Sequence, residues 1–268
     1  MVLKKAFSAA ALGLSLIAAM PSQAATITNT DGIFNWSGFD WAQAGTAYTT
    51  GFQPVAGDAF TVNAFAVAVA LQNGDTVLPT PGLDATANGL STGYEYTLSV
   101  LLNQSVDSCT PGGVTCTFSI LSGSYSIYYD AIADANALPG SLGTGFLDGP
   151  LLMSGSVFAQ PGGSFTTTPG GGFGITALLG SVDFTNLAFI NPALSDTVAV
   201  STLQLGNLTT NWTGNPGGFN GVAFTGDNLV FQADANQSFS TVPEPASLAL
   251  FGIAMLAGSV TSRRRIKK

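Results

Sequence analysis

The side chains that could do chemistry in the central part of this chain are carboxylates, hydroxyls and two thiols. Residues 6–262 contain no lysine, arginine or histidine. A histidine base, a Schiff-base amine, a phosphate clamp and a carboxylate-binding fork are therefore all missing there. Ser-His-Asp and Cys-His arrangements cannot form, and no Asp-Thr-Gly or Asp-Ser-Gly sequence supports an aspartic-protease pair. The sequence predicts a protein that is not an enzyme and has no catalytic residue, although two acids for glycoside hydrolysis stay conceivable.

Acidic side chains could instead hold a hard cation, for which carboxylate and carbonyl oxygens are the preferred ligands. Asp130 and Asp134 lie four residues apart, but no Asp-x-Asp-x-Asp-Gly loop occurs in the chain. Solvated surface acids are the preferred interpretation. We therefore assign no metal ligand and expect no cofactor, with calcium as the weaker alternative.

Two tryptophans near residue 40 raise the question of a sugar-binding platform. Trp36 and Trp41 stand among polar neighbours in the segment from Phe34 to Trp41. In one extended strand they would face opposite sides, unless Gly38 marks a bulge. We expect at least one of them to belong to the core, and aromatic packing is preferred to ligand stacking.

The two cysteines, Cys109 and Cys116, flank the turn-forming sequence Thr-Pro-Gly-Gly-Val-Thr. In an exported protein such a pair is most simply a disulfide that closes a hairpin. A redox site would favour a two-residue spacing, and a zinc site needs more ligands than two thiolates.

The elements that would position these side chains are β-strands. Short alternating segments rich in β-branched and aromatic residues are separated by Gly, Pro, Asn and Asp. This pattern predicts an all-β protein, a two-sheet sandwich of jelly-roll type, flanked by a signal helix and a transmembrane helix. The clearest strands are 60–71, 94–102, 116–129 (with a bulge or bend at 122–124), 197–205, 222–225 and 229–233.

One Gly-rich and Thr-rich run, residues 160–172, breaks the strand pattern. It is typical of either an interdomain linker or a long loop. We favour the loop of one secreted domain, residues 25–241, because the part that follows offers few strands for a core of its own.

The central segment is strongly anionic. It holds fourteen of the fifteen acidic residues of the chain, thirteen Asp and Glu95, and no cation to pair with them. Its stability must come from apolar burial, backbone hydrogen bonds and the cross-link. Nucleic acid is excluded as a partner bound by direct charge attraction, although divalent cations could bridge the protein to an acidic polymer.

The N-terminus, residues 1–24, has the three parts of a signal peptide. Lys4 and Lys5 precede an apolar run that ends near Met20, and small residues follow Pro21. We expect signal peptidase to cut between Ala24 and Ala25.

The C-terminus, residues 242–268, places three features in series: Pro243-Glu244-Pro245, an apolar segment to Val260, and a basic tail with Arg263, Arg264 and Arg265. As a helix, residues 246–262 would reach about 25 Å, slightly short of a bilayer core of roughly 30 Å. The basic tail should stay in the cytoplasm, so the segment before Pro243 faces outward. An ordinary single-pass anchor would leave the Pro-Glu-Pro sequence unexplained.

This order resembles the PEP-CTERM protein-sorting signal of exosortase substrates in Gram-negative bacteria. The resemblance implies export through the inner membrane, a transient membrane anchor, cleavage by exosortase near the motif, and delivery to the cell surface or extracellular matrix. Signal peptidase and exosortase would be the processing partners.

The segments 125–130 and 229–239 are also similar to the flocculation-associated branch of these proteins. That resemblance implies an exopolysaccharide partner and a structural role in floc or biofilm formation. A secreted lectin-like carbohydrate-binding module is the alternative, and a matrix glycosidase is a less favoured one.

Overall fold

The computed structural model describes residues 25–86, 88–89, 93–136, 143–168, 171–194, 197–208 and 229–241. Strands dominate these segments, and Pro111–Gly113 forms a single 3-10 turn, η1. The strands are β1 (Ala25–Asn29), β2 (Gly32–Trp36), β3 (Gly38–Thr50), β4 (Ala59–Asn73), β5 (Thr76–Val77), β6 (Glu95–Cys109), β7 (Thr115–Asp130), β8 (Leu151–Val157), β9 (Gln160–Thr168), β10 (Gly171–Ser181), β11 (Phe184–Thr185), β12 (Ile190–Asn191), β13 (Thr197–Leu208) and β14 (Leu229–Thr241).

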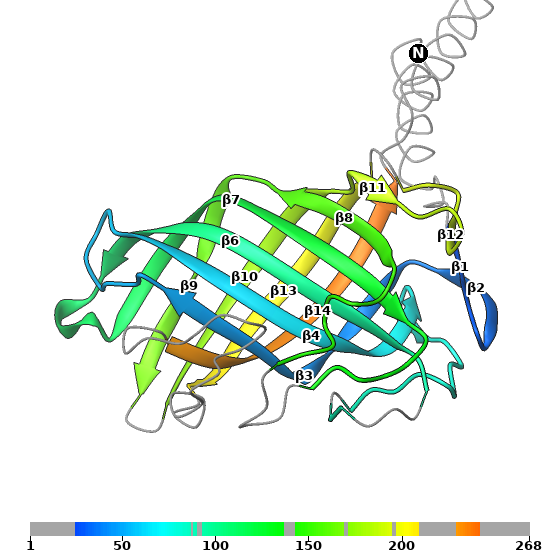
Figure 1. Ribbon diagram of the computed structural model, residues 1–268. Helices are drawn as coiled ribbons and strands as arrows, with labels where there is room; N and C mark the ends of the chain where they lie inside the picture. The colour runs from blue at the N-terminus through cyan, green and yellow to red at the C-terminus, as the bar shows by residue number, and fades with distance from the viewer. Residues whose placement is uncertain are drawn as a thin grey trace, which may run out of the picture.

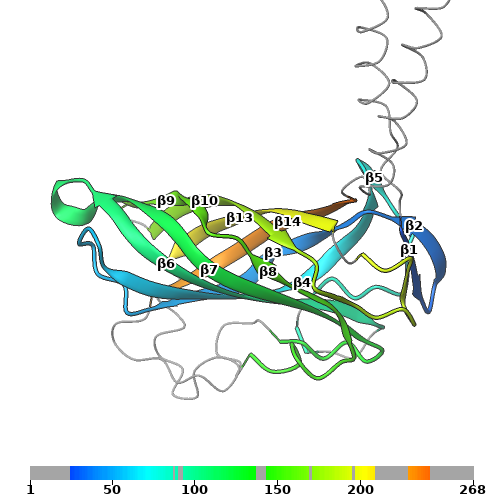
Figure 2. The same cartoon turned by 90° about the horizontal axis from the view of Figure 1, so that it is seen from above.

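The strands form two sheets, one of three strands and one of eleven. The larger sheet closes on itself, because β14 pairs with β3 and because β8 and β9 each pair with both β7 and β10. It is flattened into two layers, with β4, β6 and β7 facing β10, β13 and β14 (Figures 1 and 2). β3 joins the layers on one side, and β8 and β9 join them on the other.

The all-β class is confirmed, but the connections differ from those of a jelly roll. Described strands of the large sheet pair antiparallel with strands that are near them in sequence, and β14–β3 closes the series. This is an up-and-down meander, whereas a jelly roll brings strands together through Greek-key crossovers. The difference arises from pairings that alternation alone does not specify, since both topologies use the same inward and outward pattern.

Apolar side chains fill the space between the two layers. Along β6, inward Tyr96, Leu98, Val100 and Leu102 are buried, as alternation in a strand requires. The small sheet, β12-β1-β2, lies at the end of the molecule opposite the β6–β7 hairpin tip (Figure 1). Its buried side chains, which include Ile27, join the same core.

The Gly-rich run of residues 160–172 is not a loop, so that prediction was wrong. Most of it forms β9 and the start of β10, which pair with each other and with the rest of the large sheet. Its glycines permit a close backbone approach: a Cβ added at Gly163 would lie 1.8 Å from the carbonyl oxygen of Ile175. A composition typical of linkers here serves tight strand pairing.

Most other predicted strands are confirmed, and several extend further than expected. Residues 122–124, where we expected a bulge, pair in regular register with β6, and the register shift lies just before them, at Leu121. The predicted strand 222–225, the signal helix and the transmembrane helix lie outside the described residues. Within the part of the chain that the structure describes, no helix is sufficiently long and apolar to cross a bilayer.

Candidate functional site

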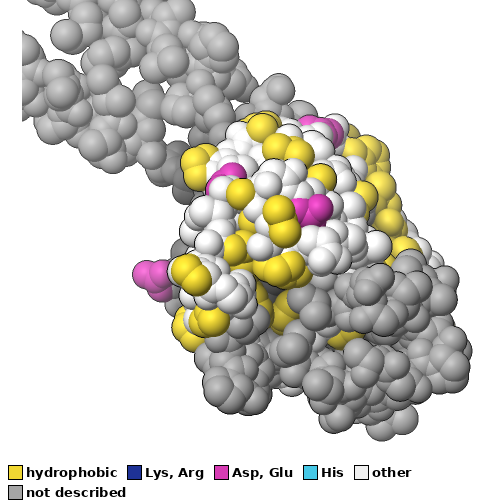
Figure 3. All heavy atoms as spheres, turned by 90° about the vertical axis from the view of Figure 1, so that its left-hand side faces the viewer, with side chains coloured by type: hydrophobic (Ala, Val, Ile, Leu, Met, Phe, Trp, Pro, Cys, Tyr) yellow, Lys and Arg dark blue, Asp and Glu magenta, His cyan; other side chains and the backbone are white. Residues whose placement is uncertain are grey.

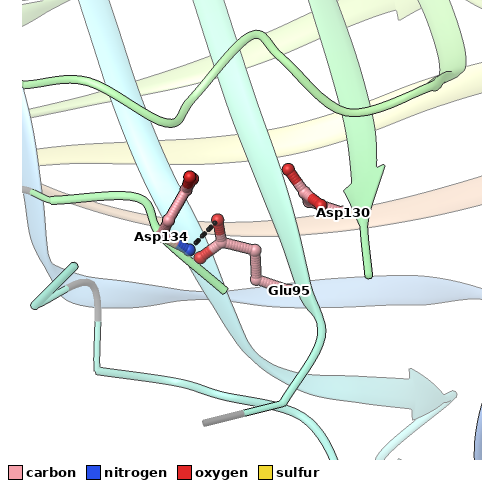
Figure 4. Close-up of side chains that lie close together, drawn as sticks. All are labelled: Glu95, Asp130 and Asp134. Carbon is pink, nitrogen blue, oxygen red and sulfur yellow. Dashed lines mark hydrogen bonds between the residues drawn. The ribbon is translucent and has the colours of Figure 1, made fainter. Parts of the chain in front are cut away.

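Three carboxylates meet at the end of the closed sheet away from the β6–β7 hairpin tip. Glu95 begins β6 and Asp130 ends β7, where the two residues are direct cross-strand partners. Asp134 follows four residues after Asp130. One carboxylate oxygen from each of the three lies within 4.8 Å of the others (Figure 4). We call these three residues the acidic cluster.

The acidic cluster also fixes a piece of chain to the outer face of the sheet. This covering segment comprises the described residues 131–136 and 143–150. Glu95 Oε1 accepts hydrogen bonds from the backbone N–H groups of Asp134, at 3.1 Å, and Ala135, at 2.9 Å. Thr97 Oγ1 donates to the carbonyl oxygen of Phe146 at 2.8 Å. Two outward side chains of β6 therefore anchor the segment.

Beneath the covering segment lies a second, smaller core. Phe146 is fully buried and contacts Phe65 edge to face, with ring centroids 5.7 Å apart. The members of this core are Tyr48, Phe65, Val67, Ala135, Phe146 and Val230. Glu95 is only 1 % exposed at its margin, so its carboxyl group is shielded from water.

Burial is the main cause that raises the pKa of Glu95 to about 7. The two backbone hydrogen bonds lower this pKa, while the nearby charges of Asp134 and Asp130 raise it further. The pKa of Asp134 is also raised, first by burial and then by repulsion from Asp148 and Asp130. No cationic side chain occurs anywhere in residues 25–241. The cluster can lower its repulsion only through a proton or a bound cation.

The hydrogen bonds of Glu95 suit a shared proton. The three carboxylate oxygens lie within 4.8 Å of one another, a spacing that is also compatible with a bound cation. One of the two Glu95 oxygens already accepts two N–H groups. Protonation of Glu95 removes its charge and leaves both of these hydrogen bonds in place.

Sequence reasoning singled out Asp130 and Asp134, and the structure brings them together. It missed Glu95, which completes the cluster. Two sequence signals were present: Glu95 is the single glutamate among thirteen aspartates of the central segment, and it starts a clear strand. What the sequence does not show is the β6–β7 register that sets Glu95 opposite Asp130.

The alternative of a sugar-stacking platform is excluded, because Trp36 and Trp41 are both fully buried. Ser37 separates β2 from β3, so the two tryptophans belong to different strands and both turn inward. Phe39 lies 4.8 Å from each indole ring, measured between centroids. The preference for aromatic packing is confirmed, and neither ring can reach a polymer.

A disulfide joins Cys109 to Cys116 across the β6–β7 hairpin, with a Cα–Cα distance of 4.1 Å. Turn η1 lies between them. The hairpin tip also contains a backbone hydrogen bond from Thr110 N–H to Thr115 O at 2.8 Å. This cross-link belongs to the scaffold, at the end of the molecule away from the acidic cluster.

The predicted sorting residues Pro243, Glu244 and Pro245 and the basic residues Arg263, Arg264 and Arg265 lie outside the described residues. So does Ala24, while Ala25 is the first residue of β1. Residues 241–265 match the PEP-CTERM protein-sorting motif. The chain carries a PEP-CTERM signal. This motif supports an exported protein that has a transient membrane anchor and is processed by exosortase.

The PEP-CTERM signal begins at the last residue of β14, Thr241. No curated protein and no solved structure matches the chain. The PEP-CTERM match therefore bears on the sorting segment, while the role of the β-rich body has to be argued from its own surface and interior.

Proposed function

We propose that the mature protein is a non-catalytic structural component of the cell surface or extracellular matrix of a Gram-negative bacterium. Exosortase would deliver it, and it would support exopolysaccharide-dependent aggregation in flocs or biofilm. The observation that carries this proposal is the combination of a PEP-CTERM signal with an all-β body that has no cationic side chain.

The outer face of β6 and β7 supports contact with a hydrated polymer. Small polar side chains lie opposite one another there, as in the pairs Ser99–Ser126 and Asn103–Ser122. Asn103 Nδ2 donates to Ser122 Oγ at 2.9 Å, and Ser119 Oγ donates to Asp107 Oδ2 at 3.0 Å. Hydroxyls, amides and acids of this kind exchange hydrogen bonds with sugar hydroxyls, and acids can share a divalent cation with an acidic polysaccharide.

The buried position of Glu95, whose pKa is raised, supports a non-catalytic role. A glycosidase needs two neighbouring carboxyl groups with different pKa values, and the adjacent carboxyl groups of Glu95 and Asp130 superficially resemble such a pair. However, Glu95 is 1 % exposed and holds the covering segment through its backbone. A sugar bond cannot reach it in this structure, so we do not propose hydrolysis. The buried tryptophans likewise remove the main support for a lectin with an aromatic platform.

Deletion of the gene in its host tests the proposal. Aggregation of the deletion strain in shaken culture should fall, and the full chain supplied on a plasmid should restore it. A chain that ends at Thr241 lacks the sorting signal, so it should be exported but fail to restore aggregation. Unchanged aggregation in the deletion strain would refute the matrix role, while leaving the PEP-CTERM assignment intact.

A variant of the β6–β7 face sharpens the test. Replacing Asn103, Ser122 and Ser124 with alanine removes outward polar groups and keeps the strand pairing. We expect this variant to reach the surface in normal amounts and to restore aggregation only in part. The matched control replaces exposed Thr76, which lies in the short β5 strand, with alanine. Equal restoration by both variants would argue against this face as the contact surface.

A further inference from the structure

An apolar face runs along the outside of β10. Phe173, Ile175 and Leu179 point outward at alternate positions and are 63, 54 and 43 % exposed. Ala177, between them, is exposed as well. Phe158 widens the row: it is 45 % exposed, and its N–H donates to the carbonyl oxygen of Leu179 at 2.9 Å. We call these five residues the β10 face.

The β10 face concentrates exposed apolar side chains as no other described strand does. Among the side chains that the structure describes, no other strand carries more than one large apolar residue that is exposed. β10 begins beside the β6–β7 hairpin tip, because Thr166 of β9 pairs with both Thr115 and Phe173. Seen from that end, hydrophobic side chains are prominent and acidic ones are few and separate (Figure 3). The four large side chains together expose on the order of 400 Å² of apolar surface, a patch size that commonly serves as an interaction site.

The surroundings of the β10 face are uncharged. On one side, β9 pairs Ser164 with Ile175 and Thr166 with Phe173. On the other side, β13 pairs β10 with three uncharged residues, Val200, Thr202 and Gln204. The ionised side chains of the body are all acids, so two copies repel each other wherever these acids are exposed. At the β10 face two copies can meet without that repulsion.

Position and chemistry disfavour a polymer or a bilayer on this face. β10 lies in the layer opposite β6 and β7 (Figure 2), so a polymer on the outer face of those two strands leaves it free. The alkyl groups of Ile175 and Leu179 cannot replace the hydrogen bonds that a sugar polymer makes with water. The face also extends away from Thr241, where the sorting segment begins, so a bilayer at that end does not cover it.

One acid near the β10 face sets the direction in which two copies can pair. Asp183 lies beyond the Leu179 end, where its carboxylate accepts hydrogen bonds from the hydroxyls of Ser156 and Ser181, each at 2.6 Å. An antiparallel pair places Leu179 of one copy over Phe173 of the other. The two Asp183 carboxylates are then farther apart than the length of the face, about 20 Å, whereas the screening length is about 8 Å in physiological salt.

We propose that the β10 face packs against the β10 face of a second copy, in antiparallel direction. A two-fold axis near Thr176 sets Ile175 of each copy above the small Ala177 of the other. Leu179 is the end of the face nearer Thr241, because Val200 pairs with both Leu179 and Ser238 of β14. The sorting segments therefore leave from opposite ends of the pair. Such pairing joins molecules on two facing surfaces, or molecules released from them, and not neighbours in one membrane.

Clustering of vesicles tests this pairing without any polysaccharide, so it can fail or hold independently of the proposed function. The full chain is inserted through its C-terminal segment into phosphatidylcholine vesicles, with the body outside. Light scattering is followed in about 150 mM NaCl, which screens the acids, with a chelator that prevents bridging by calcium. A single pair buries little area and is weak, but the many copies on each vesicle act together. Wild-type vesicles should cluster.

The variant Phe173→Ser/Ile175→Ser removes two large side chains of the β10 face. We expect its vesicles to cluster about tenfold more slowly than wild type, because each pair loses most of its apolar contact. The matched control, Ile33→Ser/Val77→Ser, removes two side chains that are 70 and 62 % exposed outside this face, and it should cluster as wild type does. Absence of clustering by wild type, or equal clustering by the two variants, would overturn the proposal.

Cross-linking tests the direction of the pair. Vesicles that carry Phe173→Cys are mixed with vesicles that carry Leu179→Cys, and a thiol reagent that spans about 8 Å is added, since packed sheets lie about 10 Å apart. The native cysteines are joined in a disulfide and do not react. We expect a cross-linked dimer in the mixture and little in either population alone. A dimer that forms equally well with Phe173→Cys alone would overturn the antiparallel arrangement.

Discussion

At the scale of single residues, Glu95 links folding to pH. Its pKa is near 4.5 in an unfolded chain and about 7 in the fold. Between these values the folded state binds a proton that the unfolded state has released, so the free energy of unfolding falls as pH rises. Stability is thus greatest below pH 4.5 as far as this group is concerned, and the loss is complete above pH 7.

We therefore predict that the variant Glu95→Gln is more stable than wild type at pH 8 by about 2 to 3 kcal/mol and nearly equal to it at about pH 4. The amide oxygen can still accept the N–H groups of Asp134 and Ala135, but the buried charge is gone. Urea unfolding at the two pH values measures the difference. Asp75→Asn, at an exposed turn, serves as the control. The difference between its free energy of unfolding and that of wild type should be the same at the two pH values.

A different outcome would identify a cation at the acidic cluster. If calcium raised the wild-type unfolding midpoint at pH 8, and Glu95→Gln abolished that rise, then a metal ion and not a proton would neutralise these carboxylates. Glu95→Gln would in that case be less stable than calcium-loaded wild type, which reverses the predicted sign.

Residue-level prediction from sequence succeeded where a function depends on neighbours along the chain. The disulfide partners are seven residues apart, and the sorting motif occupies one continuous stretch. It failed for Glu95, because the role of that residue depends on cross-strand register. It was also too cautious about Trp36 and Trp41, because the break at Ser37 that turns both inward has no strong sequence signal.

At the scale of elements, the β6–β7 hairpin depends on its cross-link only at the tip. Replacing both cysteines with serine should lower the free energy of unfolding by about 2 to 3 kcal/mol, from the small loop that the disulfide closes. The long β6–β7 pairing should preserve the fold. Unfolding with and without a reductant measures this, and the serine variant should not respond to the reductant. A loss of strand signal in circular dichroism would contradict the prediction.

The close pairing of the β9–β10 hairpin requires a residue without a side chain at Gly163. The variant Gly163→Ala would place a Cβ 1.8 Å from the carbonyl oxygen of Ile175, so the strands must separate locally. We predict a loss of about 1 to 3 kcal/mol in the free energy of unfolding. Exposed Ser164→Ala, the next residue, is the matched control and should be nearly neutral. Equal stability of the two variants would show that the pairing adjusts freely.

Strands were predictable from sequence where alternating apolar residues report the burial of one face. The β9–β10 hairpin lacks that signal. Alternating apolar residues in Ala59–Asn73 and Thr115–Asp130 report burial of one face directly. Gln160–Thr168 has few large apolar residues, so it carries little burial signal. Its pairing depends on the absence of side chains at its glycines. A glycine-rich composition, taken alone, predicts a linker instead.

At the scale of the whole molecule, uncompensated negative charge works against the fold. We predict that the thermal unfolding midpoint rises by a few degrees as NaCl increases from about 10 to 300 mM, because salt screens repulsion between exposed carboxylates. Replacing exposed Asp75 and Asp107 with asparagine should reduce this dependence. A midpoint that does not change with salt, in wild type and variant alike, would show that these charges are too far apart to interact.

The overall topology was only partly predictable from sequence. The β-class follows from local pattern, whereas the meander and its closure depend on which edges meet. Thr49 of β3 pairs with Leu229 of β14 across most of the chain. No local periodicity encodes such a contact, and jelly-roll and meander arrangements share the same strand pattern.

The β14–β3 pairing also sets an order of events for a chain that emerges N-terminus first. β3 must wait with an unsatisfied edge while the segments up to β14 arrive, and unpaired edges invite intermolecular association. Contacts this distant in sequence form late and slowly. Because β14 adjoins the sorting motif, membrane tethering would keep each emerging molecule apart from its neighbours until its final strand is in place.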